Sequence, residues 1–272
     1  MSLWRNALLL GIGIMHTLLW DGDVLVVYAL CAPVLIAVRR TSPVALMIAG
    51  TAAVLWSAVV AAVVQGTVPA TGAGLGEFWL TDGGPMSDAI GAFILNDAGA
   101  RSLGMMLIGV ALYRLDGSRS VAFYWRMTRY GLGIGLPLAA LGVALQAANG
   151  FSPTIAVIGE VPNTIATIPA TLGYLGLITL WNRRPDSRLC RRLRAVGRMA
   201  LTNYLTQTVI GIVVLHGMLG TVELHRTDIA VFVGVVWALQ LAWSSPWLRA
   251  FRFGPFEWAW RSATYARLRS LP

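Results

Sequence analysis

The sequence predicts an all-α membrane protein, a bundle of about eight transmembrane helices with both ends of the chain in the cytoplasm. Hydrophobic residues make up 57% of the 272 residues and charged residues only 12%, whereas soluble domains carry about 25% charged residues. Many of the apolar residues gather in segments close to the roughly 20 residues that cross a bilayer. Arginines and acids collect at opposite ends of these segments, as the positive-inside rule requires.

Eight apolar segments follow one another along the chain, and the turns between them alternate in charge. They cover residues 5–20, 24–38, 44–64, 89–113, 130–148, 163–181, 199–215 and 229–243. We interpret the first as a retained helix, because no small-residue cleavage site follows it. Arginines follow every second segment, and acids follow the others. An odd number of spans would place an arginine-rich turn or tail outside, so the charges favour an even number.

The densest run of charge lies just before the seventh segment. Seven arginines occur between Arg183 and Arg198, and the net charge of the chain is +9. A charge of this size is typical of proteins that bind nucleic acid, but here the arginines separate apolar segments instead of forming one basic face. We therefore expect membrane lipids as partners and no nucleic acid.

Two regions are predicted, a transmembrane domain over residues 1–245 and a cytoplasmic tail over residues 246–272. The tail is rich in arginine and tryptophan, and we expect it to form an interfacial amphipathic helix that begins at Pro255. Cys31 lies in an apolar segment and Cys190 among the arginines, at a different depth, so no disulfide is expected.

Small and polar residues mark two of the later segments. In the fifth, Gly131, Gly135 and Gly142 are spaced for close helix contact. In the seventh, Asn203 and Gln207 lie four residues apart, as do Thr202 and Thr206, and the four side chains form a polar stripe. Such side chains usually bond to adjacent helices, although a substrate path along the stripe is the alternative.

The first candidate for chemistry is His16, which lies inside the first segment and shortly precedes Asp21 and Asp23. An ionisable side chain at membrane depth is costly unless it faces a wet cavity or a polar partner. A histidine whose tautomer is fixed by a carboxylate can act as a general base. The alternative is a neutral core histidine, with the two acids capping the turn.

A second candidate cluster contains Asn96, Asp97 and Arg101 in the fourth segment. Asp97 and Arg101 are four residues apart, so they share a helix face and can pair. Binding of a substrate anion by Arg101 is the functional interpretation, and a structural ion pair near the outer interface is the other. No motif indicates a cofactor, and the outer histidines and acids match no metal-ligand spacing.

Several motifs carry a resemblance to a known family. They are Gly197-Arg198-Met199-Ala200-Leu201-Thr202-Asn203-Tyr204-Leu205 with Gln207-Thr208, His16 with Leu19-Trp20-Asp21-Gly22-Asp23, Gly104-Met105-Met106-Leu107-Ile108-Gly109, and Trp247-Leu248-Arg249 with Gly254-Pro255, Glu257-Trp258 and Trp260-Arg261. The chain resembles the YeiB-like family of bacterial multi-pass membrane proteins, which carry a domain of unknown function, most strongly over residues 104–261. Typical members begin with further spans, so the resemblance implies a short member or a lost start.

The resemblance implies a bacterial cytoplasmic membrane location and, more distantly, a similarity to transmembrane acyltransferases. If the protein is an enzyme, we expect acyl transfer with His16 as proton acceptor, oriented by Asp21 or Asp23, and Arg101 binding an anionic group. An acyl donor or lipid-linked substrate would then be the partner. A small-solute transporter or channel that uses Asp97, Arg101 and the polar stripe is an alternative, and a structural or partner-binding membrane protein is a third.

Overall fold

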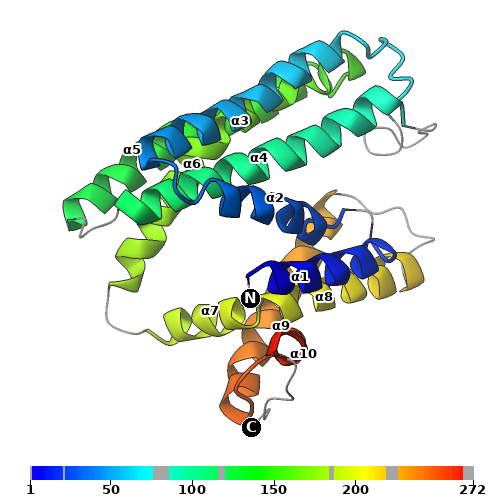
Figure 1. Cartoon of the computed structure of the whole chain (residues 1–272). Helices are drawn as coiled ribbons and strands as arrows, with labels where there is room; N and C mark the ends of the chain where they lie inside the picture. The colour runs from blue at the N-terminus through cyan, green and yellow to red at the C-terminus, as the bar shows by residue number, and fades with distance from the viewer. Residues whose placement is uncertain are drawn as a thin grey trace. The chain divides into compact units, whose positions relative to one another are not determined.

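The computed structural model describes residues 2–20, 22–75, 86–115, 120–183, 187–218 and 226–265 (Figure 1). The regular elements of this part of the chain are all helices, which confirms the predicted all-α class. The chain divides into two compact units. We call Leu30–Arg184 the central unit, and Met1–Ala29 with Pro185–Pro272 the terminal unit.

Four long helices build the central unit, and the later part of α2 (Leu25–Ala37) joins them. They are α3 (Pro43–Gln65), α4 (Asp88–Leu115), α5 (Val121–Ala148) and α6 (Val161–Asn182). α3 lies along α4, and α5 lies along α6 (Figure 1). Ser42 and Ser120 cap α3 and α5, because each side chain accepts a hydrogen bond from a first-turn N–H.

Glycine allows α5 and α6 to approach closely, as predicted for Gly131 and Gly135. A Cβ added at Gly131 would lie 2.5 Å from the backbone nitrogen of Gly173, and one at Gly135 would lie 2.5 Å from that of Ala170. At Gly142 the corresponding contact is a looser 3.3 Å. Backbone atoms cannot move aside as a flexible side chain can, so the helix pair depends on the first two glycines.

Gly131→Ala should therefore destabilise the protein, whereas Gly133→Ala should not. A Cβ at Gly133 meets no atom within 4 Å. Overpacking of this kind typically costs roughly 1–3 kcal/mol, and alanine in an open helical position is favourable. The midpoint of thermal unfolding in detergent measures the difference, and equal midpoints for the two variants would contradict the close packing.

The terminal unit consists of α1, the start of α2, and the helices that follow the central unit. These are α1 (Ser2–Thr17), α7 (Arg188–Arg198), α8 (Ala200–Gly211), the π-helical segment η3 (Ile212–Met218), α9 (Arg226–Ala250) and α10 (Pro255–Tyr265). The tail helix α10 begins at Pro255, as predicted. It contacts α1, where the Trp4 indole donates to the Ala263 carbonyl at 3.2 Å, and the Trp260 indole donates to the Arg5 carbonyl at 3.2 Å.

Two details differ from the sequence-based expectation. The arginine run was expected to be a turn, but it forms α7, because Ser187 caps its first turn and arginine is a good helix former. α9 continues to Ala250, past the boundary expected at residue 245, with Pro246 inside the helix.

Four described helical segments are long and apolar enough to cross a membrane. They are Pro43–Gln65, Val121–Ala148, Ile158–Asn182 and Thr227–Ala250. Leu25–Ala37 and Ala200–Leu215 are shorter apolar helices. These helices agree with a membrane protein, while the count of eight spans and the cytoplasmic position of both termini stay predictions.

Candidate functional site

His16 and Asp23 form a buried pair inside the terminal unit. The last turn of α1 carries His16, and Asp23 precedes α2. His16 Nδ1 lies 2.7 Å from Asp23 Oδ1, and the two side chains are 3% and 0% exposed. The other carboxylate oxygen, Oδ2, accepts a hydrogen bond from the Val26 N–H at 2.9 Å, so Asp23 also caps the first turn of α2. Asp23 therefore both pairs with His16 and caps α2, while the role of His16 as a general base stays a prediction.

Tyr204 of α8 binds the same carboxylate oxygen as His16. Its hydroxyl donates to Asp23 Oδ1 at 3.1 Å and accepts from the Val24 N–H at 3.2 Å. Its ring also lies against the imidazole of His16, with ring centroids 5.1 Å apart. The Asp23 carboxylate thus accepts hydrogen bonds from a histidine, a tyrosine and a backbone amide.

These contacts assign the tautomer of His16. A carboxylate only accepts hydrogen bonds, so His16 Nδ1 carries the proton that it donates to Asp23. In a neutral imidazole, Nε2 then has a free lone pair. The Thr208 hydroxyl lies 3.0 Å from Nε2 and can donate its proton to that lone pair. Asp23, His16 and Thr208 form a continuous relay that ends at a hydroxyl group.

Gly13 gives Asp23 room to lie against α1. A Cβ at Gly13 would lie 2.8 Å from the Val26 nitrogen and 3.0 Å from Asp23 Oδ2, whereas a Cβ at Gly11 meets nothing within 4 Å. Gly13→Ala should therefore displace α1 from Asp23 and lower any activity that depends on the pair. Misplacing a catalytic group by about 1 Å can cost roughly a hundredfold.

Gly11→Ala is the matched control for that prediction, since it changes the same helix without a clash. Turnover of both variants, measured at equal amounts of folded protein, tests the prediction. Equal turnover would show that the spacing between Gly13 and Asp23 is unimportant.

An apolar cavity of about 530 Å³ adjoins the relay within the terminal unit. Tyr204 and Thr208 form part of its wall, with Gln207 beside them. The remaining lining residues are Trp20, Gly22, Val24, Gly211, Leu215, Ile229, Phe232, Val233, Val236 and Trp237. Gln207, a predicted substrate-binding residue, therefore faces a cavity that also reaches the relay.

Asn203 is placed differently, because its side chain is fully used in helix packing. Its Nδ2 donates to the Val196 carbonyl and to Ser244 Oγ, both at 3.2 Å, and its Oδ1 accepts from the Trp243 indole at 2.9 Å. Its backbone carbonyl accepts from Gln240 at 2.9 Å. Asn203 is only 4% exposed and joins α7, α8 and α9. Of the two interpretations of the polar stripe, this arrangement agrees with hydrogen bonding to adjacent helices. A substrate role for Asn203 stays a prediction.

A second junction joins α8 to the tail helix. The Glu257 carboxylate of α10 accepts from the Thr202 N–H at 3.0 Å and from the Thr202 hydroxyl at 2.5 Å. It thereby satisfies one of the free N–H groups in the first turn of α8. Gly254 allows this approach, since a Cβ there would lie 2.6 Å from Thr202 Oγ1.

The second predicted cluster lies in the central unit, at a place where α4 meets α3. Arg101 Nη2 pairs with Asp97 Oδ2 at 2.6 Å, as the spacing predicted, and Asp97 also accepts a hydrogen bond from the buried Ser57 hydroxyl. The neighbouring Asn96 accepts from the Trp56 indole at 3.1 Å, but its buried Nδ2 has no hydrogen-bond partner among the described residues. The ion pair is thus tied into the helix packing, and anion binding by Arg101 stays a prediction.

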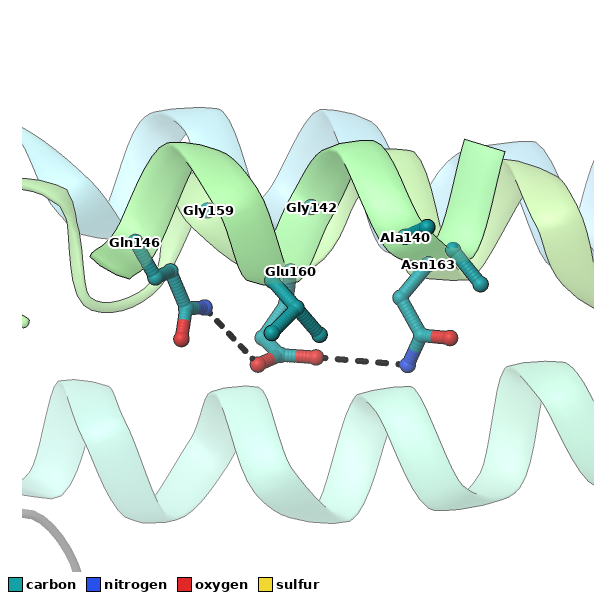
Figure 2. Close-up of a pocket in the computed structure, with 8 residues that line it drawn as sticks. Ala140, Gly142, Gln146, Gly159, Glu160 and Asn163 are labelled. Atoms are coloured by element: carbon teal, nitrogen blue, oxygen red, sulfur yellow. Dashed lines mark hydrogen bonds between the residues drawn. The ribbon is translucent and has the colours of Figure 1, made fainter. Parts of the chain in front are cut away.

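The central unit also has a polar pocket of about 300 Å³ at the start of α6, in which Glu160 lies between two amides. Gln146 Nε2 donates to one carboxylate oxygen at 3.0 Å, and Asn163 Nδ2 lies 3.4 Å from the other (Figure 2). Gly159 allows the contact, since a Cβ there would lie 2.8 Å from Gln146 Nε2. The bond from Gln146 links the end of α5 to the start of α6, whereas Glu160 and Asn163 both lie at the start of α6. Gln146 and Glu160 therefore hold the connection between the two helices.

The structure thus brings His16 and Asp23 together and places Asp97 with Arg101, while Asp21 lies outside the described residues. Sequence reasoning missed the roles of Tyr204, Thr208 and Glu257. Tyr204 and Thr208 do not belong to the predicted polar stripe. The available signal for them was their spacing of four residues on an apolar helix, which puts both side chains on one helix face. No cluster of metal-ligating side chains occurs within the described part of the chain.

The apolar helices and the buried polar relay define a helical integral membrane protein with an ionisable centre among its helices. The chain belongs to the family described as "Protein of unknown function (DUF418)", whose model matches residues 112–267. It is 31% identical over 289 residues to "Uncharacterized protein YeiB" of Escherichia coli (strain K12), a match that covers 96% of this chain and 74% of that protein. These matches confirm the YeiB-like resemblance.

A second relative matches a shorter part of the chain. "Uncharacterized protein YxaH" of Bacillus subtilis (strain 168) is 38% identical over 93 residues, which cover 33% of this chain and 23% of that protein. No solved structure matches the chain significantly.

Proposed function

We propose that the protein is a membrane-embedded transferase of acyl groups and that His16 is its general base. The observation that carries the proposal is the buried relay in which Asp23 holds His16 Nδ1 at 2.7 Å, while Nε2 faces a hydroxyl at 3.0 Å. A histidine oriented by a carboxylate and directed at a hydroxyl is the arrangement that activates oxygen nucleophiles.

The relay supports the following proton transfers. As a hydroxyl oxygen attacks the acyl carbonyl, its proton moves to His16 Nε2. The Asp23 carboxylate stabilises the imidazolium that forms, without taking the proton itself. The imidazolium then gives the proton to the departing group. General base catalysis of this kind contributes roughly 10²–10⁴-fold to the rate.

The adjoining cavity suits the apolar part of such a substrate. Its volume of about 530 Å³ falls within the range of about 300–1,000 Å³ that is usual for ligand sites. Leu215, Phe232 and Val236 supply apolar walls, and Gln207 is a polar lining residue. An acyl donor with a hydrocarbon chain, or a lipid-linked acceptor, fits this combination better than a small hydrophilic solute does.

Acyl transfer in proteoliposomes tests the proposal. Purified protein is supplied with a radiolabelled decanoyl thioester and lipid acceptors, and the label that reaches the lipid fraction is measured. Wild type should transfer the label, and His16→Ala should lose the activity at unchanged abundance and insertion. Undiminished transfer by His16→Ala would overturn the proposal.

Transport of a small solute is a second candidate, favoured by one observation in the central unit. The buried Nδ2 of Asn96 has no hydrogen-bond partner among the described residues and lies next to the Asp97–Arg101 pair in sequence. A buried donor without a partner can mark a binding position for a polar ligand. Uptake of labelled solutes into proteoliposomes, with Arg101→Gln as the variant, would reveal this function, and absence of flux would remove it.

We also propose a cytoplasmic-membrane location with the arginine-rich turns inside. The alternation of arginine and acid turns supports this orientation. Single cysteines introduced at Arg40 and at Asn149 should react with a membrane-impermeant maleimide from opposite faces. Labelling of both from the same face would contradict the orientation.

A further inference from the structure

We propose that Thr208 is the nucleophile of this site and carries the acyl group as a covalent ester during transfer. This inference rests on the proposed acyl transfer and adds a second step to it. The Thr208 hydroxyl already occupies the position beside His16 Nε2 that an attacking hydroxyl needs, at 3.0 Å. Any other hydroxyl would first have to displace it from the one lone pair that a neutral His16 offers when Asp23 holds Nδ1.

The position of Thr208 connects the base to the cavity. Its hydroxyl contacts His16, and Thr208 forms part of the cavity wall with Gln207 and Gly211. Thr208 lies one turn of α8 after Tyr204, which binds Asp23. The hydroxyl also makes a long contact of 3.5 Å to the Tyr204 carbonyl. An acyl group on Thr208 Oγ1 therefore has apolar space beside it.

The transfer takes two steps. In the first, Thr208 Oγ1 attacks the carbonyl of an acyl thioester, its proton moves to His16 Nε2, and the thiol departs with that proton, which leaves an ester on Thr208. In the second, the hydroxyl of the acceptor attacks this ester and gives its proton to His16. The proton then returns to Thr208 Oγ1 as the C–O bond breaks, and the new ester leaves.

Thr206 provides a matched control on the same helix. Its hydroxyl donates to the Thr202 carbonyl at 2.8 Å and lies 3.2 Å from the Asn203 carbonyl, so it is engaged with its own helix. Thr206→Val and Thr208→Val make the same chemical change, a hydroxyl to a methyl group, but only the second removes the nucleophile. Thr208→Ser keeps the hydroxyl and guards against a loss that is due to folding alone.

A decyl fluorophosphonate supplies a probe that does not depend on knowing the natural donor. Attack by Thr208 on phosphorus expels fluoride and leaves a phosphonyl adduct, which peptide mass spectrometry can locate. The adduct should form on Thr208 in wild type and in Thr206→Val, and on the introduced serine in the Thr208→Ser variant. It should be absent in Thr208→Val and His16→Ala. Absence of the adduct from wild type, or its location elsewhere, would overturn the inference.

The transfer assay separates this inference from the proposed function. Thr208→Val should lower transfer of the decanoyl group by more than roughly a thousandfold, as removal of a nucleophile does, while Thr208→Ser and Thr206→Val should stay within about tenfold of wild type. If Thr208→Val transfers at the wild-type rate and His16→Ala does not, the acyl-transferase proposal stands and the covalent step is wrong. If wild type transfers no acyl group, the proposed function itself fails.

Discussion

Asp23→Asn is expected to lower acyl transfer by roughly 10³- to 10⁴-fold, the effect of holding a catalytic histidine in the wrong tautomer. The side chain keeps its shape, but its amide group donates where the carboxylate accepted. His16 would then accept at Nδ1 and carry its proton on Nε2, so the lone pair that faces Thr208 would be lost. Transfer of the labelled decanoyl group, at equal amounts of folded protein, measures the loss.

Tyr204→Phe is the control for this prediction. It removes one hydrogen bond to Asp23, of 3.1 Å, but leaves the carboxylate and the tautomer of His16 in place. We expect a loss of only about tenfold, which corresponds to about 1.4 kcal/mol. If Asp23→Asn were as active as Tyr204→Phe, Asp23 would serve only to cap α2.

Asn203→Leu is expected to give the largest loss of stability in the terminal unit. The variant keeps the approximate volume but leaves the Trp243 indole, the Ser244 hydroxyl and the Val196 carbonyl without their partner. Hydrogen bonds between membrane helices average about 0.6 kcal/mol each, and a buried group left without a partner costs about 1–3 kcal/mol. The combined loss is roughly 2–5 kcal/mol, enough to reduce the amount of folded protein in the membrane.

Gln207→Leu on the same helix separates packing from substrate binding. Gln207 lines the cavity, whereas Asn203 is bonded to two neighbouring helices. Gln207→Leu should therefore leave the thermal midpoint unchanged and alter the KM for the acyl donor. The reverse pattern, with a stable Asn203→Leu and an unstable Gln207→Leu, would exchange the roles assigned to the two residues.

The fold class could be predicted from the sequence because lipid imposes a strong pattern. Apolar length and arginine position located most helices within a few residues, and Gly131 and Gly135 of α5 were correctly expected to make close contacts. The helix of the arginine run was missed, since a run of like charges between two spans is usually a turn. Ser187, which caps this helix, is a local signal for a helix start, but the density of arginines favoured a turn.

The site could be predicted only in part, because proximity in sequence and proximity in space differ. His16 and Asp23 are close along the chain, so their pairing could be proposed. Thr208 and Tyr204 reach the same point from α8, and no local pattern states which face of α8 meets α1. The same limit applies to Glu257, whose carboxylate contacts Thr202 across a long separation in sequence.

Asp23 must hold the proton of His16 on Nδ1 for Nε2 to act as a base, and nitrogen NMR measures that position directly. Protein with ¹⁵N-labelled histidine, in which His216 and His225 are replaced by glutamine, gives the signals of His16 alone. At about pH 8, the spectrum should show a protonated Nδ1 and an unprotonated Nε2. A proton found on Nε2 instead would contradict the relay from Asp23 through His16 to Thr208.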